Sequence, residues 1–285
     1  MKFLIIQENG RHDANRHMRE CFCMQRALHK HGQECDVWGL GHSNFNTAVD
    51  YESYDVIINL ENYDTGWVPS LSNTVKPLKL LWAIDAHFQG IGHYLNIFNT
   101  GKYHKILQAT KTFVDMNSIW FPNCYDDTVI YPIPDVGKQS FIGFCGNYVN
   151  RKPLLDSLQS RIPGFQVAVG VLGTKMLETI SSWHIHFNAN VNGDINYRSF
   201  ETLGCKSVLL TNKDYQYDLL GFKHGENCLI YGSIDEAVAI AENYRNKTNE
   251  LQAIAEAGYA FVKSKHTYNV RAEELLNLIP SIYGQ

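Results

Sequence analysis

The chain has 285 residues, 45% of them hydrophobic, and a formal net charge of −4 at pH 7. This length suits two domains with separate cores. The slightly acidic balance excludes a strongly basic coat for nucleic acid, although it allows a local basic patch. The sequence has no apolar run of about 18 residues, so we expect no membrane span and a location in the cytoplasm, or in the host cytoplasm if a phage encodes the protein.

The first half of the chain alternates strand and helix patterns. A continuous apolar run over residues 3–6 predicts a parallel strand that is buried on both faces. A polar loop follows, and residues 14–31 then carry apolar side chains at helical spacing until Gly32. Further strands are expected at residues 35–38, 56–60, 78–84 and 106–109. This alternation predicts a doubly wound α/β domain that binds ligands at the carboxyl ends of its strands.

A proline-containing linker over residues 131–137 divides the chain, and the strand-helix pattern restarts after it. Strands are expected at residues 141–145, 165–169, 184–187, 208–211 and 228–231, with helices at 151–161, 176–180 and 235–244. The restart predicts two similar α/β domains that face a cleft. We place them at residues 1–132 and 133–266, with residues 267–285 forming a C-terminal helix that packs back on the first domain.

The most informative stretch is 196–211, which has the pattern of a short helix, a stop of small residues and a buried strand. Arg198 and Glu201 are three residues apart, so they share one helical face. A cation and a carboxylate near the N-terminal end of a helix suit a ligand with phosphates and vicinal hydroxyls, which describes a nucleotide or a nucleotide-sugar. The alternative is an ordinary ion pair on the surface of a helix.

Several motifs then occur in a recognisable order. The sequence has Asn-x-Arg-x-Phe-Glu from Asn196, Gly-Glu at 225–226, Ile-Ala-Glu-Ala-Gly at 254–258 and His-Thr-Tyr-Asn-Val-Arg-Ala at 266–272. Over residues 141–276 the chain resembles glycosyltransferases with two facing Rossmann-like domains, the GT-B fold, and most of all their CgeB-like members. Lys206 stands where that family usually has glycine. The resemblance implies a glycosyltransferase that uses a nucleoside-diphosphate sugar, most simply a UDP-sugar.

The resemblance also implies roles for individual residues. Glu201 would accept hydrogen bonds from the ribose hydroxyls of the donor, and Arg198 would face its diphosphate. Asn196 opens the same motif, while Gly146 and Arg151 belong to a strand-loop-helix junction of the kind that binds phosphate, although an ordinary turn fits that junction too. Retaining relatives carry a second glutamate eight residues before the first. Gly193 occupies that position here, which favours inversion of the anomeric carbon.

The strand expected over residues 78–84 ends at Asp85, with His87 two residues further on. Attack of a hydroxyl on an anomeric carbon benefits from a general base, and we assign Asp85 to that role with His87 as its orienting or acceptor-binding partner. The alternative is a helix N-cap at Asp85. A fainter likeness to phage β-glucosyltransferases, which modify hydroxymethylcytosine in DNA, rests on a similar strand ending in an aspartate.

The loop after the first strand contributes Glu8, Arg11 and His12, which we assign to the acceptor side. The helix after this loop carries several arginines that fit either a solvated face or a contact with a phosphate backbone. The acceptor therefore stays open between a 5-hydroxymethylated base in double-stranded phage DNA and a hydroxyl on a polysaccharide, protein or small metabolite.

No resident cofactor is expected beyond the UDP-sugar as co-substrate. The sequence has no Asp-x-Asp pair, so nothing in it indicates a divalent metal, and His184 with His186 would need further ligands to bind zinc. Two other functions stay open. One is a nucleotide-sugar-binding module without catalysis, and the other is a dinucleotide-dependent oxidoreductase, which the missing Gly-x-Gly-x-x-Gly pattern disfavours.

Overall fold

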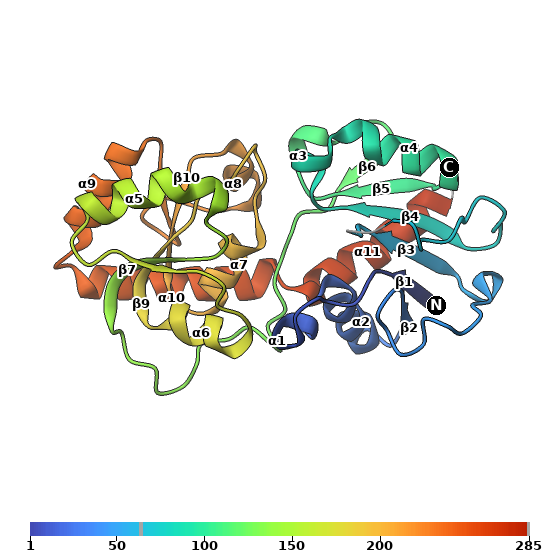
Figure 1. The fold of residues 1–285 in the computed structure, drawn as a ribbon, viewed down its shortest axis with the longest axis horizontal. Coiled ribbons are helices and arrows are strands. Elements are labelled where there is room, and N and C mark those ends of the chain that lie inside the picture. The colour runs from blue at the N-terminus through green and yellow to red at the C-terminus, as the bar shows by residue number, and fades with distance from the viewer. Residues whose placement is uncertain (63–64, 284–285) are drawn as a thin grey trace. The chain divides into compact units, whose positions relative to one another are not determined.

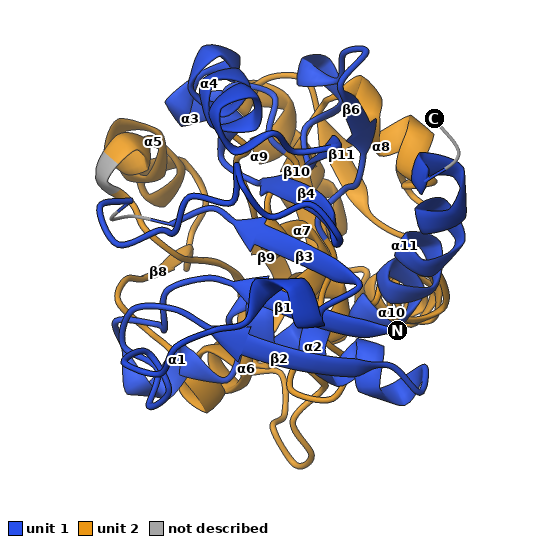
Figure 2. Cartoon of the chain, turned by 90° about the vertical axis from the view of Figure 1, so that its right-hand side faces the viewer, with its two compact units in different colours: residues 1–123, 192–194, 268–285 blue, residues 124–191, 195–267 orange. Residues whose placement is uncertain are grey.

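The computed structural model of the chain describes residues 1–62 and 65–283, which divide into two units (Figures 1 and 2). Unit 1 contains residues 1–123, 192–194 and 268–285, and unit 2 contains residues 124–191 and 195–267. Each unit is built on its own parallel sheet. The predicted α/β class with two parallel-sheet domains is therefore confirmed. The domain boundaries placed after residues 132 and 266 remain a prediction.

The sheet of unit 1 has six parallel strands in the order β2-β1-β3-β4-β5-β6. The strands are Lys2–Ile6 (β1), Glu34–Trp38 (β2), Val56–Leu60 (β3), Leu78–Ala83 (β4), Lys105–Gln108 (β5) and Ser118–Trp120 (β6). The α-helices are Asp13–Arg16 (α1), Glu20–Lys30 (α2), Ala86–Gln89 (α3), Ile91–Gly101 (α4) and Tyr268–Tyr283 (α11), and short 3₁₀ turns cover Tyr51–Ser53 and Lys111–Phe113. Sequence reasoning missed β6, which is short and only partly apolar.

Helices cover both faces of this sheet, which explains why its central strands are almost wholly apolar. Leu81 and Trp82 are neighbours in β4, so they point to opposite faces. Leu81 packs in one cluster with Tyr94 of α4. The ring of Trp82 lies 6.3 Å from the ring of Tyr268, at the start of α11 (Figure 1). The C-terminal helix thus belongs to unit 1, as predicted, and the buried Arg271 fixes it by donating to Pro122 O at 2.9 Å.

The sheet of unit 2 has five parallel strands in the order β11-β10-β9-β7-β8. The strands are Ser140–Cys145 (β7), Gln166–Ala168 (β8), Trp183–Phe187 (β9), Val208–Asn212 (β10) and Leu229–Tyr231 (β11). The helices are Lys152–Arg161 (α5), Gly173–Ser181 (α6), Tyr197–Gly204 (α7), Tyr215–Leu220 (α8), Ile234–Tyr244 (α9) and Thr248–Lys265 (α10), with a 3₁₀ turn at Val149–Arg151. Ser233 caps α9 by accepting the N–H of Glu236 at 3.2 Å, as its position predicts.

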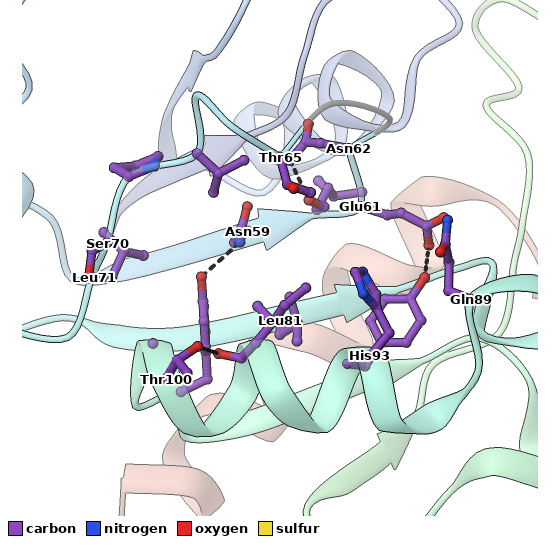
Figure 3. Close-up of a pocket in the computed structure, with 17 residues that line it drawn as sticks. Asn59, Glu61, Asn62, Thr65, Ser70, Leu71, Leu81, Gln89, His93 and Thr100 are labelled. Atoms are coloured by element: carbon purple, nitrogen blue, oxygen red, sulfur yellow. Dashed lines mark hydrogen bonds between the residues drawn. The ribbon is translucent and has the colours of Figure 1, made fainter.

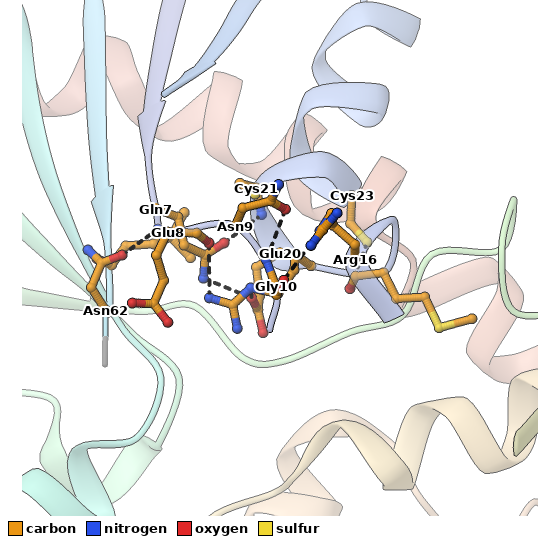
Figure 4. Close-up of polar contacts among 12 residues, drawn as sticks. Gln7, Glu8, Asn9, Gly10, Arg16, Glu20, Cys21, Cys23 and Asn62 are labelled. Atoms are coloured by element: carbon orange, nitrogen blue, oxygen red, sulfur yellow. Dashed lines mark hydrogen bonds and ion pairs between the residues drawn. The ribbon is translucent and has the colours of Figure 1, made fainter. Parts of the chain in front are cut away.

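The single helix expected over residues 14–31 is in fact two helices, α1 and α2, with an extended backbone at Arg19, where ψ is 146°. The side chain of Gln7, just beyond β1, explains the break (Figure 4). Its Oε1 accepts the N–H of Cys21 at 3.0 Å, and its Nε2 donates to Glu20 Oε2 at 2.8 Å. A residue outside the helix therefore satisfies its first turn, and helical periodicity carries no sign of such a contact.

The turn after α7 forms although a lysine occupies it. Lys206 has a φ of +58°, in the left-handed region that glycine adopts most easily. Its N–H donates to Leu203 O at 2.9 Å, and the next N–H, of Ser207, donates to Thr202 O at 3.2 Å. Lys206 Nζ also pairs with Glu256 at 2.6 Å. The departure from glycine thus leaves the tight turn between α7 and β10 intact.

No helix in the described part of the chain is both long enough and apolar enough to cross a membrane.

Candidate active site

The polar pair predicted on α7 is present in unit 2. Arg198 Nη1 lies 2.6 Å from Glu201 Oε2, and the two side chains are 21% and 16% exposed. The same nitrogen lies 2.7 Å from Met176 Sδ on α6. Arg198, near the start of α7, is thus held against α6, and both side chains of the pair are largely buried but still partly exposed to solvent. An ion pair in this setting is more strongly fixed than one on an open helix face.

A buried network of polar side chains fixes the loop that leads into α7. Asn188 follows β9 and donates to Thr211 Oγ1 at 3.2 Å and to Ser199 Oγ at 3.4 Å. Tyr217 OH lies 2.9 Å from Thr211 Oγ1 and receives a hydrogen bond from Asn190 at 2.7 Å. The loop, the start of α7 and the end of β10 are therefore locked together. A preorganised helix start of this kind suits recognition of a polar ligand.

Asn196 is the N-cap residue of α7. Its Nδ2 donates to Asn188 Oδ1 at 3.2 Å, and its side chain does not cap the helix. Among residues 1–62 and 65–283, its Oδ1 finds no hydrogen-bond partner. Asn196 thus anchors the loop. Its side chain accepts no hydrogen bond from the backbone N–H groups in the first turn of α7.

Arg151 joins two loops of unit 2 that follow neighbouring strands. Its Nε donates to Ala189 O at 3.0 Å, in the loop after β9, and its Nη1 donates to Asn147 O at 3.2 Å, in the loop after β7. Gly146, in the β7 loop, donates its N–H to Ala168 O at 3.1 Å. The structure thereby places Arg151 and Gly146 at the same sheet edge as the loop that leads to Asn196 and Arg198.

His186, considered above as a metal ligand, has a structural role. It is fully buried, and its Nε2 accepts the N–H of Cys145 at 3.1 Å. Nδ1 therefore carries the proton and donates to Thr202 Oγ1 at 2.7 Å. Burial lowers the pKa of His186 well below its ordinary value, and the Arg198 charge adds to this effect. The described residues contain no cluster of three His, Cys, Asp or Glu side chains able to hold a metal.

In unit 1, Asp85 follows β4 and occupies the N-cap position of α3, with a side chain that is 44% exposed. Within the described chain this side chain makes no capping hydrogen bond, so the N-cap position does not explain the residue. His87 is close, but its Nδ1 lies 4.0 Å from Asp85 Oδ1, too far for a hydrogen bond. The imidazole is almost fully covered and packs on Phe88, with ring centroids 4.2 Å apart.

Glu61 is a site residue that sequence reasoning missed. It follows β3 as Asp85 follows β4, and β3 pairs with β4. Glu61 Oε2 accepts the N–H groups of Ile84 and Asp85 at 3.1 and 2.7 Å and the hydroxyl of Tyr94. Burial, together with the charge of Asp85, raises the pKa of Glu61. The signal available in the sequence was an acidic residue directly after each of two buried strands.

Asp85 is also harder to ionise than an ordinary aspartate. Burial raises its pKa, and the nearby carboxylate of Glu20 adds to the rise. Two adjacent carboxyl groups with raised pKa values hold a proton between them more readily than either would alone. This pair therefore accepts a proton at a higher pH than an ordinary carboxylate does, which makes it a stronger base.

We expect Glu61→Gln to raise the thermal stability of the protein increasingly as pH rises. The raised pKa means that wild-type stability is fully present below the ordinary glutamate value of 4.5 and falls as pH rises through the higher folded-state pKa. Glutamine keeps the hydrogen bonds and cannot ionise. Melting temperatures between pH 4 and 8 test this, with Glu273→Gln, exposed on α11, as control. Parallel curves for Glu61→Gln and wild type would contradict the expectation.

The three acceptor-side residues assigned from the first loop lie in different environments. Glu8 is only 5% exposed, and its N–H donates to Asn62 Oδ1 at 2.6 Å, in the loop after β3 (Figure 4). Arg11 and His12 are exposed. The loop thus carries one residue turned into the sheet edge near Glu61 and two on the surface.

The arginines of α1 and α2 are engaged within unit 1. Arg16 pairs with Asp13 at 2.7 Å, and Arg26 donates to His17 O at 2.8 Å. Arg19 lies 3.7 Å from Glu20 and donates to Glu8 O at 3.4 Å. These contacts favour the solvated-face interpretation of this basic segment over a dedicated phosphate site.

Comparison with protein-family models finds a match in the second half of the chain. Residues 151–277 match a family model described as glycosyl transferase-like. This segment begins at Arg151 and includes all of α7, so it contains the Arg198–Glu201 pair. The search of curated proteins found no match.

Solved structures of glycosyltransferases match this chain over nearly its whole length. Sucrose-phosphate synthase from Thermosynechococcus elongatus has a TM-score of 0.73 at 10% identity, with 100% of both chains covered. Anabaena HepE in complex with UDP and glucose has a TM-score of 0.68 at 12% identity, over 99% of this chain and 100% of HepE. An α-glucosyltransferase in complex with UDP-glucose and DNA containing an abasic site has a TM-score of 0.70 at 11% identity, over 98% and 99%.

At these identities the solved structures establish the fold, while the family match establishes the type of enzyme. The predicted resemblance is confirmed: the chain is a glycosyltransferase of the GT-B fold, and its residues 151–277 match the glycosyl transferase-like family model.

Proposed function

We propose that the protein transfers a sugar from a UDP-sugar to an acceptor hydroxyl, and that unit 2 binds the donor. The observation that carries this proposal is the Arg198–Glu201 pair, held at 2.6 Å at the start of α7 beside the loop tied down by Arg151. A carboxylate that faces a diol and two guanidinium groups that face phosphates match the two polar parts of a nucleoside diphosphate. Solved relatives that hold UDP or UDP-glucose support this donor.

In this proposal Glu201 accepts hydrogen bonds from the ribose hydroxyls of the donor. Arg198 and Arg151 bind the diphosphate, together with the backbone N–H groups near Gly146 and at the start of α7. Asn196 holds the loop that leads into α7. These charges stabilise the leaving UDP as its bond to the sugar breaks. The site needs no resident cofactor for this chemistry.

Asp85 in unit 1 acts as general base in the same proposal. It takes the proton of the acceptor hydroxyl while the oxygen forms its bond to the anomeric carbon, and UDP departs with the electrons of the broken bond. One displacement inverts the anomeric configuration, in line with Gly193 standing where retaining relatives have a glutamate. The carboxylate of Glu61 accepts the backbone N–H of Asp85 at 2.7 Å and so holds this residue in place. His87 packs on Phe88 in the same segment and shapes this part of the site, while Glu8, Arg11 and His12 form the acceptor side of the proposal.

For the acceptor we propose a 5-hydroxymethylated base in double-stranded DNA, with the reaction taking place in the cytoplasm, or in the host cytoplasm for a phage protein. A relative solved with DNA and UDP-glucose supports this choice. A hydroxyl on a polysaccharide, protein or small metabolite is the second candidate. It is favoured by the excess of acidic residues in residues 1–135, 15 Asp and Glu against 11 Lys and Arg, because such a surface repels phosphates.

A screen of donors and acceptors tests both parts of the proposal, the UDP-sugar donor and the acceptor hydroxyl. UDP-sugars are incubated with hydroxymethylated DNA, oligosaccharides and small alcohols, and the products are identified by mass spectrometry. We expect a mass gain on one acceptor class, and stabilisation of the protein by UDP but not by NAD. A gel shift with modified DNA that vanishes at high salt would support the DNA acceptor. UDP binding without transfer to any acceptor would instead indicate a non-catalytic nucleotide-sugar-binding module.

A further inference from the structure

A cavity of about 270 Å³ lies within unit 1 (Figure 3), and it is lined by Glu61, the residue that accepts the Asp85 N–H. Its walls come from β3, β4, α4 and the segment over residues 65–71. Glu61 and Tyr94 line one end, and Tyr103 and Asn59 line the other parts of the wall. The volume is just below the roughly 300–1,000 Å³ of typical small-molecule sites, so the cavity suits a group of about one ring.

Asn59 is the unusual member of this wall. It is only 4% exposed, and its Nδ2 donates to Tyr103 OH at 2.8 Å. Within the described residues its Oδ1 has no hydrogen-bond partner. A buried polar atom left unpaired costs about 1–3 kcal/mol, so a protein tends to keep one only where something else satisfies it. Asn59 Oδ1 thus points to a hydrogen-bond donor that enters the cavity.

Tyr103 supplies the complementary group. Its hydroxyl oxygen accepts from Asn59, which leaves the hydroxyl proton to be donated. Burial raises the pKa of Tyr103 to about 12, so this proton stays in place at neutral pH. The cavity therefore offers an acceptor, Asn59 Oδ1, directly beside a donor, Tyr103 OH.

The rest of the wall combines an aliphatic part with a polar part. The aliphatic part is Leu60, Val68, Pro69, Leu71, Leu81 and Ile97, and the polar part is Asn62, Thr65, Ser70, Gln89, His93 and Thr100. The aliphatic part of the wall suits the flat face of a heteroaromatic ring, whereas sugar hydroxyls placed against it would lose their hydrogen bonds to water. The carboxyl group of Glu61 at one end disfavours an anionic ligand.

We propose that this cavity binds an uncharged heteroaromatic ring that presents a hydrogen-bond donor next to an acceptor, the pattern on the edge of a pyrimidine base. This deepens the proposed transfer function and rests on it, because the ring would be part of the acceptor. Glu61 both lines the cavity and accepts the Asp85 N–H. A hydroxymethyl group on a ring bound here would reach the Glu61 end, next to the base.

The test measures binding of 5-hydroxymethyl-2′-deoxycytidine and, separately, of methyl β-glucoside by titration calorimetry. Ile97→Trp and Val68→Trp fill the cavity from α4 and from the 65–71 segment, and both sites are only half-buried, so the fold should tolerate them. Ile91→Trp, on the same helix and outside the cavity wall, is the matched control. Melting curves confirm that each variant is folded.

We expect both cavity-filling variants to bind the nucleoside at least about tenfold more weakly than wild type, since a ring cannot enter a filled cavity, while Ile91→Trp binds it normally. Asn59→Leu should weaken binding by about tenfold through loss of one buried hydrogen bond. Equal affinity in wild type, Ile97→Trp and Val68→Trp would overturn the proposal. Absence of nucleoside binding to wild type, or cavity-dependent binding of the glucoside instead, would overturn it too.

Affinity for UDP, measured in the same variants, separates this proposal from the proposed function. UDP should bind wild type and all four variants equally, because the donor site lies in unit 2. If UDP binds normally and the cavity variants bind the nucleoside as wild type does, the proposed ring site is wrong but the proposed sugar transfer is not contradicted. If the nucleoside binds in a cavity-dependent way but UDP does not bind at all, the proposed transfer from a UDP-sugar is wrong and the ring site is supported.

Discussion

Asp85→Asn is expected to lower kcat for sugar transfer by about 10²–10⁴-fold, the usual contribution of a positioned general base. An amide cannot accept the proton of the acceptor hydroxyl, whereas its size and its backbone hydrogen bond to Glu61 stay the same. The affinity for UDP should not change. Initial rates at saturating donor and acceptor, together with UDP titrations, provide the measurement.

Asp50→Asn is a suitable control for this variant. Asp50 also lies in unit 1 at the start of a short helix, is exposed and does not cap that helix with its side chain. We expect wild-type kcat from it. The wild-type rate should also fall as pH drops through the raised pKa of the Asp85–Glu61 pair, because the protonated pair cannot act as a base. Unchanged kcat in Asp85→Asn would remove this residue from the mechanism.

Arg198→Ala is expected to weaken UDP binding by about 10- to 100-fold, the effect of losing one charge-assisted hydrogen bond of about 1.5–3 kcal/mol. Turnover of the UDP-sugar should fall at least as much, because in the proposed mechanism the same guanidinium stabilises the leaving diphosphate. Glu201→Gln should weaken binding of UDP but not of inorganic diphosphate, since its proposed partner is the ribose diol. Calorimetric titration with both ligands separates the two roles.

Arg245→Ala provides the matched control for the loss of an ion pair. Arg245 pairs with Glu242 at 2.7 Å, three residues apart on α9 of the same unit, and this pair is remote from the α7 loop in sequence. It should leave UDP affinity and turnover unchanged. Arg198→Ala also leaves a half-buried Glu201 without its cation, so melting curves must show that the variant is folded at the assay temperature. Undiminished donor turnover in both Arg198→Ala and Glu201→Ala would reject the donor site.

Local patterns in the sequence predicted the parts of the fold that depend on local physics. A continuous apolar run marked β1, because a strand covered on both faces has no polar side. The strands β3 and β4 were predicted as well, although each contains one polar residue, Asn59 and Lys79. The i,i+3 spacing of Arg198 and Glu201 predicted a contact that the structure forms at 2.6 Å. The prediction of a single helix over residues 14–31 was wrong, because Gln7, from another element, satisfies the first turn of α2.

The sequence by itself determined the fold class, the resemblance to glycosyltransferases and the polar pair on α7, since strand patterns, helical spacing and ordered motifs are properties of neighbouring residues. The tertiary structure alone decided which distant residues meet. The strand order β2-β1-β3-β4-β5-β6 brings the ends of β3 and β4 together, and so pairs Glu61 with Asp85. It also places Asn59 and Tyr103 at one cavity. Strand order depends on packing across the whole sheet, which no local pattern records.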